Sequence, residues 1–272
     1  MNTLIIISVL TVFCSCTGLP EYEIHPFDGS KSTDYYYNND SLYIELSNPL
    51  KCPLRILSVT ENKSVKLLLE DFEVLLPPET DTIIVYPYIN EEQPKISFKW
   101  IYGNPSDEIK LKKLVLPIPK GKEYEITQGY NGRFTHYSDY QKFALDINLG
   151  IGDTVYSAAN GYVVGVIDGY EYGGSSKEWE NYANYITLYH PEMNVFTQYV
   201  HLLYCGSFVA VGDWVDSEQP IGISGMTGRT NIEHLHFNVL KASKNNLLSV
   251  PTEFIGGYNG INLKSGDKIK KY

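Results

Sequence analysis

The chain has 272 residues, enough for one or two domains, and its 22 basic and 32 acidic side chains give a formal net charge of −10. Acidic residues outnumber basic ones in both halves, so no basic half or tail could neutralise phosphates, and a nucleic-acid partner is not expected. A hydrophobic content of 43% with 20% charged residues indicates a globular protein rather than a disordered one.

The N-terminus carries an apolar run, LIIISVLTVF at residues 4–13, which matches the core of a signal peptide and is too short to span a bilayer. Cys14 and Cys16 follow it, and a Cys in this position resembles the lipobox of bacterial lipoproteins. We expect residues 1–15 to be a lipoprotein-type signal peptide and Cys16 to carry the lipid. The expected location is therefore outside the cytoplasm, membrane-anchored and facing the periplasm or the cell surface. A plain secretory signal is the alternative, since no Lys or Arg precedes the run.

Residues 16–41 are polar and rich in Tyr, and we expect them to form a linker. Strand patterns begin at residue 42, where Leu42, Ile44 and Leu46 alternate with other side chains. Pro-containing turn signals separate further short strands up to residue 118. This spacing predicts a β-sandwich accessory domain over 42–118, with an immunoglobulin-like arrangement as one form of it. The region contains no His, and nothing in it looks catalytic.

A boundary is expected near residues 117–119, because five of the six His residues fall between 136 and 236. The alternation of residues 143–149 predicts a strand with Asp146 on its polar face. In a strand at residues 234–239, His234 and His236 project from one face. Two exposed strand histidines and a solvated carboxylate are the alternative interpretation of these patterns.

The order of the motifs over about residues 122–240 resembles the lysostaphin-type (LytM-like) zinc endopeptidases that act on peptidoglycan. The motifs that carry the resemblance are FALDI (143–147), GDTV (152–155), AANGYV (158–163), NYITLYH (184–190), QYVHL (198–202), GDWV (212–215), IGISGMTG (221–228) and HLHF (234–237). The resemblance implies a mainly antiparallel β fold for residues 119–272, of the duplicated hybrid motif type, with a groove over the sheet.

The resemblance also assigns roles to individual residues. Asp146 and His236 match zinc ligands, while His201 and His234 match the two catalytic histidines that do not bind the metal. The family commonly places its first ligand four residues before the Asp, where this chain has Lys142. A variant with a longer spacing is also familiar, and it assigns His136, ten residues before Asp146, as the first ligand. Tyr130 stands where a family Tyr can contact the substrate in the transition state.

The expected cofactor is therefore one Zn²⁺ per chain, held by two imidazoles and one carboxylate with an open position for water. The expected activity is zinc-dependent hydrolysis of the peptide cross-links between stem peptides of bacterial peptidoglycan, with a zinc-activated water as nucleophile. The alternative is a catalytically silent member that serves as a cell-wall-binding scaffold or as a regulator of other hydrolases. Cys52 and Cys205 are expected to be separate buried thiols rather than a disulfide.

Overall fold

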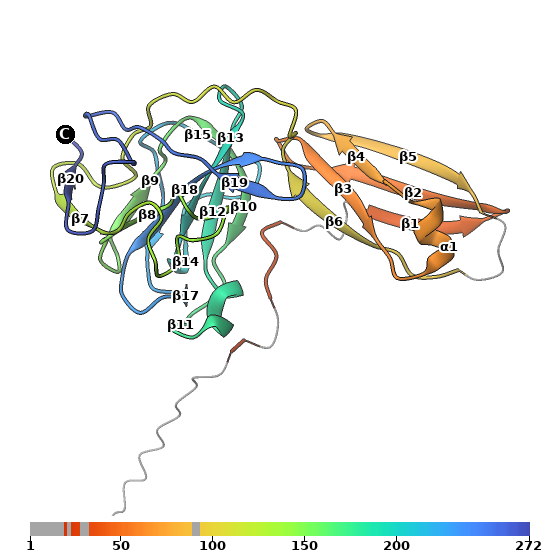
Figure 1. Ribbon diagram of the computed structural model, residues 1–272, viewed down its shortest axis with the longest axis horizontal. Coiled ribbons are helices and arrows are strands. Elements are labelled where there is room, and N and C mark those ends of the chain that lie inside the picture. Colours follow the sequence, from red (N-terminus) through yellow and green to blue (C-terminus); the bar gives the residue numbers. More distant parts are fainter. Residues whose placement is uncertain (1–18, 21–22, 28–32, 89–92) are drawn as a thin grey trace, which may run out of the picture.

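The computed structural model describes residues 19–20, 23–27, 33–88 and 93–272, and it confirms the prediction of a mainly β protein built from antiparallel sheets. Two bodies lie side by side, one formed by the earlier strands and one by the later strands (Figure 1). The expected signal peptide and Cys16 lie outside the described residues. No helix within those ranges is long and apolar enough to cross a membrane.

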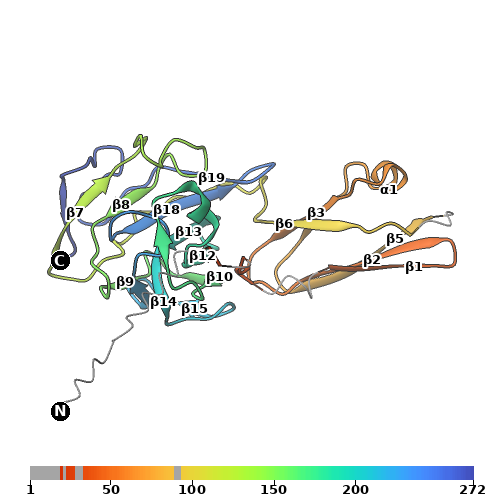
Figure 2. The same cartoon turned by 90° about the horizontal axis from the view of Figure 1, so that it is seen from below.

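The N-terminal body is a sandwich of two three-stranded sheets, seen as two layers in Figure 2. The alternation that starts at Leu42 is confirmed, because Leu42, Ile44 and Leu46 are at most 2% exposed and pack in the core between the layers. An immunoglobulin-like arrangement is not confirmed. The first sheet has the order β1(Thr33–Asn38), β2(Ser41–Asn48), β5(Thr80–Pro87); the second has the order β4(Glu73–Leu76), β3(Leu54–Val59), β6(Ser97–Tyr102), with helix α1(Lys63–Leu68) after β3.

Strand β1 lies inside the range that was expected to be a linker, so that expectation is wrong for residues 33–41. Asn39 and Asp40 both have positive φ, at 45° and 59°, and they connect β1 to β2 as a two-residue hairpin turn. Asn and Asp tolerate this left-handed conformation, which matches the twist of the two strands. Tyr35 and Tyr37 then point inward and pack against the core of the sandwich.

The C-terminal body is built on a nine-stranded sheet. Its order is β15(Trp214–Val215), β10(Gly161–Ile167), β12(Tyr185–His190), β13(Val195–Val200), β18(Leu235–Ala242), β8(Leu145–Ile147), β7(Glu123–Gln128), β20(Lys268–Lys270), with β19(Leu247–Ser249) also paired to β18. A second sheet has the order β14(Leu202–Ser207), β16(Pro220–Ser224), β9(Thr154–Tyr156), and β11(Gly173–Gly174) pairs in parallel with β17(Gly228–Arg229), beside the 3₁₀ helix η2(Lys177–Asn181).

The two faces of the large sheet pack in different hydrophobic cores. Tyr199 on β13 and Phe237 on β18 point into the main core of the C-terminal body. Phe196 and Leu240, on the opposite face of the same two strands, belong to the hydrophobic cluster that also forms the core of the sandwich. His236 shares this second face, because side chains alternate along a strand. The sandwich therefore packs on the face that carries the candidate site.

Arg55 on β3 ties the two bodies together and is only 1% exposed. Its guanidinium donates to the carbonyl oxygens of Ser243 (2.5 Å), Lys244 (2.7 Å) and Gly103 (3.1 Å), and it pairs with Glu73 Oε1 at 3.1 Å. Buried carbonyl groups that lose their donor are costly, so this residue should matter for stability.

The cysteines Cys52 and Cys205 form no disulfide, and both are free. Cys52 is buried in the sandwich core, as expected. Cys205 is exposed, contrary to expectation, because an irregular stretch of β14 gives it a φ of 50° and places it at the surface.

We expect Arg55→Ala to lower the free energy of unfolding by about 3 kcal/mol, because it removes a buried cation and leaves its carbonyl partners unpaired. Lys51→Ala is the control: Lys51 pairs with Glu79 at 2.5 Å, but both side chains are solvated, at 34% and 58% exposure. That exposed pair is worth less than about 1 kcal/mol. Urea denaturation of both variants tests this, and equal losses would contradict it.

Candidate metal centre

Asp146 and His236 are brought together by strand pairing. Strands β8 and β18 are antiparallel neighbours, and Asp146 lies directly opposite His236 in their register. Side chains directly opposite each other on neighbouring strands point the same way, with Cβ atoms about 5 Å apart. Asp146 Oδ1 and His236 Nδ1 are 2.8 Å apart, and each residue is 6% exposed.

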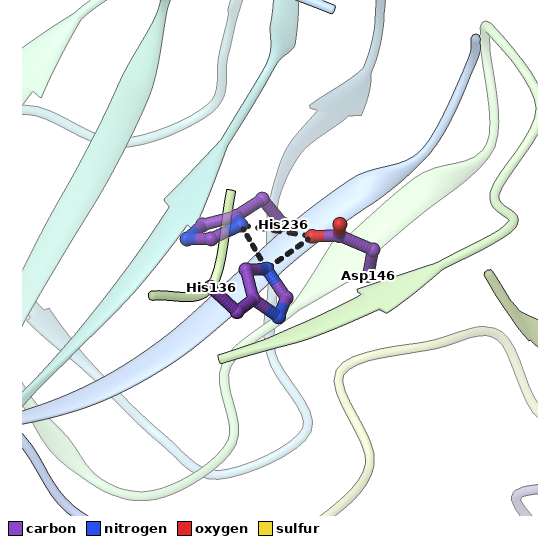
Figure 3. Close-up of side chains that lie close together, drawn as sticks. All are labelled: His136, Asp146 and His236. Carbon is purple, nitrogen blue, oxygen red and sulfur yellow. Dashed lines mark hydrogen bonds and ion pairs between the residues drawn. The ribbon is translucent and has the colours of Figure 1, made fainter. Parts of the chain in front are cut away.

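His136 arrives from the loop before β8 and is completely buried. The carbonyl oxygen of Gly129 lies 2.9 Å from His136 Nδ1 and fixes the orientation of the ring. The far end of the loop is held to the sheet, since Asn238 Nδ2 donates to the carbonyl oxygen of Tyr140 at 2.6 Å. His136 Nε2 consequently lies 3.2 Å from Asp146 Oδ1 and 3.3 Å from His236 Nδ1 (Figure 3).

The spacing of these three atoms suits one metal ion. Two nitrogens and one oxygen lie 2.8, 3.2 and 3.3 Å from one another. Ligands of a tetrahedral zinc ion at about 2.0–2.1 Å are themselves about 3.3 Å apart. The three side chains form the His136, Asp146 and His236 group, whose ligand atoms all lie within 4.8 Å of one another. These residues therefore fit a metal with no rearrangement of the strands.

The hydrogen-bond pattern requires a positive charge at this point. A carbonyl oxygen only accepts, so His136 Nδ1 must donate its proton to Gly129. In a neutral imidazole, Nε2 is then an acceptor, yet it faces Asp146 Oδ1, which is an acceptor as well. Either an extra proton or a metal cation must lie between them.

Asp146 remains ionised in this setting. Burial by itself raises the pKa of the Asp146 carboxyl group, but hydrogen bonds from His136 and His236 and the charges of His236 and His234 outweigh burial. They hold its pKa well below the ordinary value. Burial lowers the pKa of His236, with Asp146 partly opposing that shift, so a neutral imidazole is favoured there.

Gln128 fixes the carboxylate and was missed in the sequence. It lies opposite Asp146 in the β7–β8 pair, and its Nε2 donates to Asp146 Oδ2 at 2.9 Å. Thr135 Oγ1 accepts from the same nitrogen at 2.7 Å, and Phe134 N donates to Gln128 Oε1 at 3.2 Å. Oδ2 is thereby occupied, which leaves Oδ1 directed at the two imidazoles. No motif marks Gln128, since its partner across the sheet cannot be identified from one sequence.

His201 and His234 lie together beside the ligand group, with ring centroids 4.6 Å apart. His201 Nδ1 donates to the carbonyl oxygen of Thr227 at 2.7 Å, and His234 Nδ1 donates to that of Ile232 at 3.0 Å. Each ring thus directs Nε2 away from these carbonyl groups, and His234 Nε2 lies 3.6 Å from Asp146 Oδ1. Burial lowers the pKa of His201 most, and the neighbouring His234 and His236 lower it further, to about 3. The His201 imidazole is therefore neutral at physiological pH.

The backbone at His201 is unusual for a residue other than Gly. Its φ is 67°, in the left-handed region, which costs roughly 1–3 kcal/mol for a side chain of this size. The turn is held by Gly225 N, which donates to the carbonyl oxygen of His201 at 2.9 Å. This turn, at the end of β13, places the ring beside His234 instead of continuing the strand.

A cavity of about 500 Å³ opens above these residues and is lined by His201, His234 and His236. His136 and Asp146 do not line it themselves. Tyr137 and Phe134 stand on its rim, 66% and 53% exposed, and neither was singled out in the sequence. Of the three ligand candidates, His236 faces the groove together with His201 and His234, and it contacts His136 and Asp146 behind it.

Two other candidates from the sequence lie elsewhere. Lys142 is at the surface, where its Nζ pairs with Asp139 at 2.8 Å, so it is not part of the ligand group. Tyr130, expected to contact substrate, does not line the cavity. Its hydroxyl accepts from Thr252 N at 3.0 Å and its ring packs edge-on against Phe143. Burial raises its pKa to about 12, and in this structure the side chain packs away from the groove.

Comparison with known proteins agrees with this geometry. Residues 140–247 match the model of "Peptidase family M23", a range that includes Asp146, His201, His234 and His236 but begins after His136. A protein from Buchnera aphidicola subsp. Baizongia pistaciae, described as an uncharacterized metalloprotease, is 30% identical over 131 residues. That stretch is 46% of this chain and only 31% of the relative, so the chain spans about a third of the curated relative's length.

Among solved structures, the catalytic domain of the antimicrobial peptidase lysostaphin from Staphylococcus simulans is 26% identical, with 47% of this chain and 86% of that chain covered and a TM-score of 0.34. A zinc-containing peptidase from Vibrio cholerae is 17% identical, with 80% of each chain covered and a TM-score of 0.36. The match of residues 140–247 to peptidase family M23 confirms the resemblance noted in the motifs, over the part of the chain that carries Asp146, His201, His234 and His236.

Proposed function

We propose that this protein is a zinc-dependent endopeptidase that hydrolyses the peptide cross-links of bacterial peptidoglycan. The observation that carries the proposal is the convergence of His136, Asp146 and His236 on one point, next to a groove that His236 lines together with His201 and His234. The match to family M23 supports peptidase chemistry. The motifs shared with the lysostaphin-type enzymes support peptidoglycan as the substrate.

Zinc is the metal that this donor set suits best. Two imidazole nitrogens and one carboxylate oxygen are a common ligand set of catalytic zinc, whereas magnesium and calcium prefer all-oxygen sites. Three protein ligands leave a fourth position for water or substrate. Two of the ligands are also held by hydrogen bonds on the side away from the metal position: His136 by the carbonyl oxygen of Gly129 and Asp146 by Gln128. In metalloenzymes, such hydrogen bonds orient the ligands.

Bound zinc would polarise the scissile carbonyl group and make a water molecule nucleophilic at neutral pH. The protein supplies the rest of the chemistry. Asp146 stays ionised and balances part of the metal's charge. His201 is neutral and its Nδ1 is engaged with Thr227, so its Nε2 can accept a proton from the attacking water.

His234 has the complementary position. Its Nδ1 donates to the carbonyl oxygen of Ile232, and its Nε2 lies 3.6 Å from Asp146 Oδ1, so this edge of the ring lies next to the ligand group. A protonated Nε2 would donate a hydrogen bond to the developing oxyanion, while the proton that His201 takes from water would pass to the leaving amine and return His201 to its neutral form. No Ser or Cys nucleophile is needed, because water attacks directly.

The alternative function is that of a silent scaffold that binds the cell wall or regulates other hydrolases. Every residue type that hydrolysis requires is present and grouped around one point, which favours the enzyme. Zinc binding without release of peptides from cell-wall sacculi would favour the scaffold instead.

The choice of His136 over Lys142 can be tested by metal content. We expect the purified protein to hold one zinc per chain, His136→Ala to lose most of it, and Lys142→Ala to keep it, since an ammonium group cannot be a ligand. Elemental analysis and titration with a zinc indicator measure this. Retention of zinc by His136→Ala together with its loss in Lys142→Ala would overturn the assignment.

Variants of the two proposed catalytic histidines, His201 and His234, should lose turnover without losing zinc. We expect His201→Ala and His234→Ala each to keep zinc and to lose about 10²–10⁴-fold in rate, the range for acid–base groups. The double variant should lose less than the product, because both residues serve one transition state. The assay is the release of soluble muropeptides from purified sacculi, with peptide bonds cut and glycan chains intact. Near-normal turnover in either single variant would remove that residue from the mechanism.

A further inference from the structure

The segment Glu23–Phe27, which was expected to be linker, forms part of the groove wall. Glu23, Ile24, His25 and Pro26 line the same cavity as His201, His234 and His236. The whole sandwich separates this segment from the catalytic residues in the sequence. Figure 1 shows it passing between the two bodies, beside the C-terminal one.

Specific contacts hold the segment against the C-terminal body. Val166 N on β10 donates to the carbonyl oxygen of Pro26 at 2.9 Å, and Ile24 N donates to the hydroxyl of Tyr170. Asn181 Nδ2 donates to Glu23 Oε1 at 2.9 Å. These bonds use the main chain of the segment as well as its side chains, so they fix its path along the groove.

Two glycines make room for the segment. A Cβ at Gly169 would lie 2.5 Å from Ile24 Cδ1, and a Cβ at Gly165 would lie 3.1 Å from Pro26 Cβ. Neither Gly has the positive φ that would by itself explain the absence of a side chain. The surface of the C-terminal body is therefore shaped to receive Ile24 and Pro26.

The segment lines the groove without filling it. The cavity of about 500 Å³ exists with the segment in place, and the His25 side chain is exposed along it. An imidazole can both donate and accept hydrogen bonds, which matches the amide groups of a peptide. His25 is thus available to a peptide that lies across His201 and His234.

We propose that Glu23–Phe27 is a substrate-binding wall of this active site and that His25 contacts the peptide of the substrate. This inference rests on the proposed peptidase function and adds to it a residue from outside the peptidase domain. The segment that leads into the sandwich thereby completes the groove, so the catalytic domain alone would bind its substrate more weakly.

The test compares steady-state cleavage of soluble cross-linked muropeptides by the purified zinc-loaded protein and its variants. His25→Ala should raise KM about 3–10-fold, the value of one hydrogen bond, with kcat within about two-fold and zinc content unchanged. Gly169→Val should also raise KM, because the new side chain displaces Ile24. Leu19→Ala is the matched control and should behave as wild type, since Leu19 is exposed and does not line the cavity.

A wild-type KM in both His25→Ala and Gly169→Val would overturn the inference, and so would a rise in kcat/KM, which would make the segment an inhibitory cover. In both cases the wild-type protein still cleaves muropeptides, so the proposed function stands. A wild-type protein that neither cleaves nor binds muropeptides would overturn the proposed function itself, and this inference with it.

Discussion

Three electron-donating atoms face one another inside this protein, and the rest of the site follows from that arrangement. His136 Nε2, Asp146 Oδ1 and His236 Nδ1 are 2.8–3.3 Å apart and belong to buried side chains. Because His136 Nδ1 donates its hydrogen bond to the carbonyl oxygen of Gly129, the lone pair of a neutral His136 Nε2 faces the negatively charged Asp146 Oδ1, and the two atoms repel unless a cation lies between them. A metal ion satisfies all three atoms at once, which is why this geometry suits a metal site.

The large sheet makes this arrangement possible. The register of β8 with β18 places the carboxylate opposite one imidazole, and the register of β7 with β8 places Gln128 where it occupies the second carboxylate oxygen. The same face of the sheet then continues into the contact with the sandwich. The groove and the domain contact are therefore neighbours on one surface, and the segment Glu23–Phe27 touches both, since Glu23–Pro26 line the groove and Phe27 packs against Tyr102 of the sandwich.

Much of this could be predicted from the sequence, because period-2 alternation reports which side chains share a face. The alternation indicated that Leu42 and its neighbours on β2 face the core, that His234 and His236 project from the same face of one strand, and that Asp146 lies on the polar face of another. The order of motifs identified the peptidase domain. The hairpin turn at Asn39 and Asp40 lies in a polar, Tyr-rich stretch whose composition favours a linker, so the strand before it is shown only by the structure. Other features depend on long-range contacts that no local pattern records. Gln128 acts through its cross-strand neighbour, and Tyr130 is turned toward Thr252 rather than the groove.

His136 could be predicted only in part. Its spacing from Asp146 made it a candidate, but only the folded loop shows that its Nε2 reaches the other two ligands.

The proposed chemistry depends on one metal ion held by three named atoms. The most direct measurement is anomalous diffraction at the zinc edge from crystals of the protein. We expect a single strong peak about 2.0–2.2 Å from His136 Nε2, Asp146 Oδ1 and His236 Nδ1. A zinc peak bound by His201 or His234 in place of His136, or the absence of any peak in crystals supplied with zinc, would contradict this assignment.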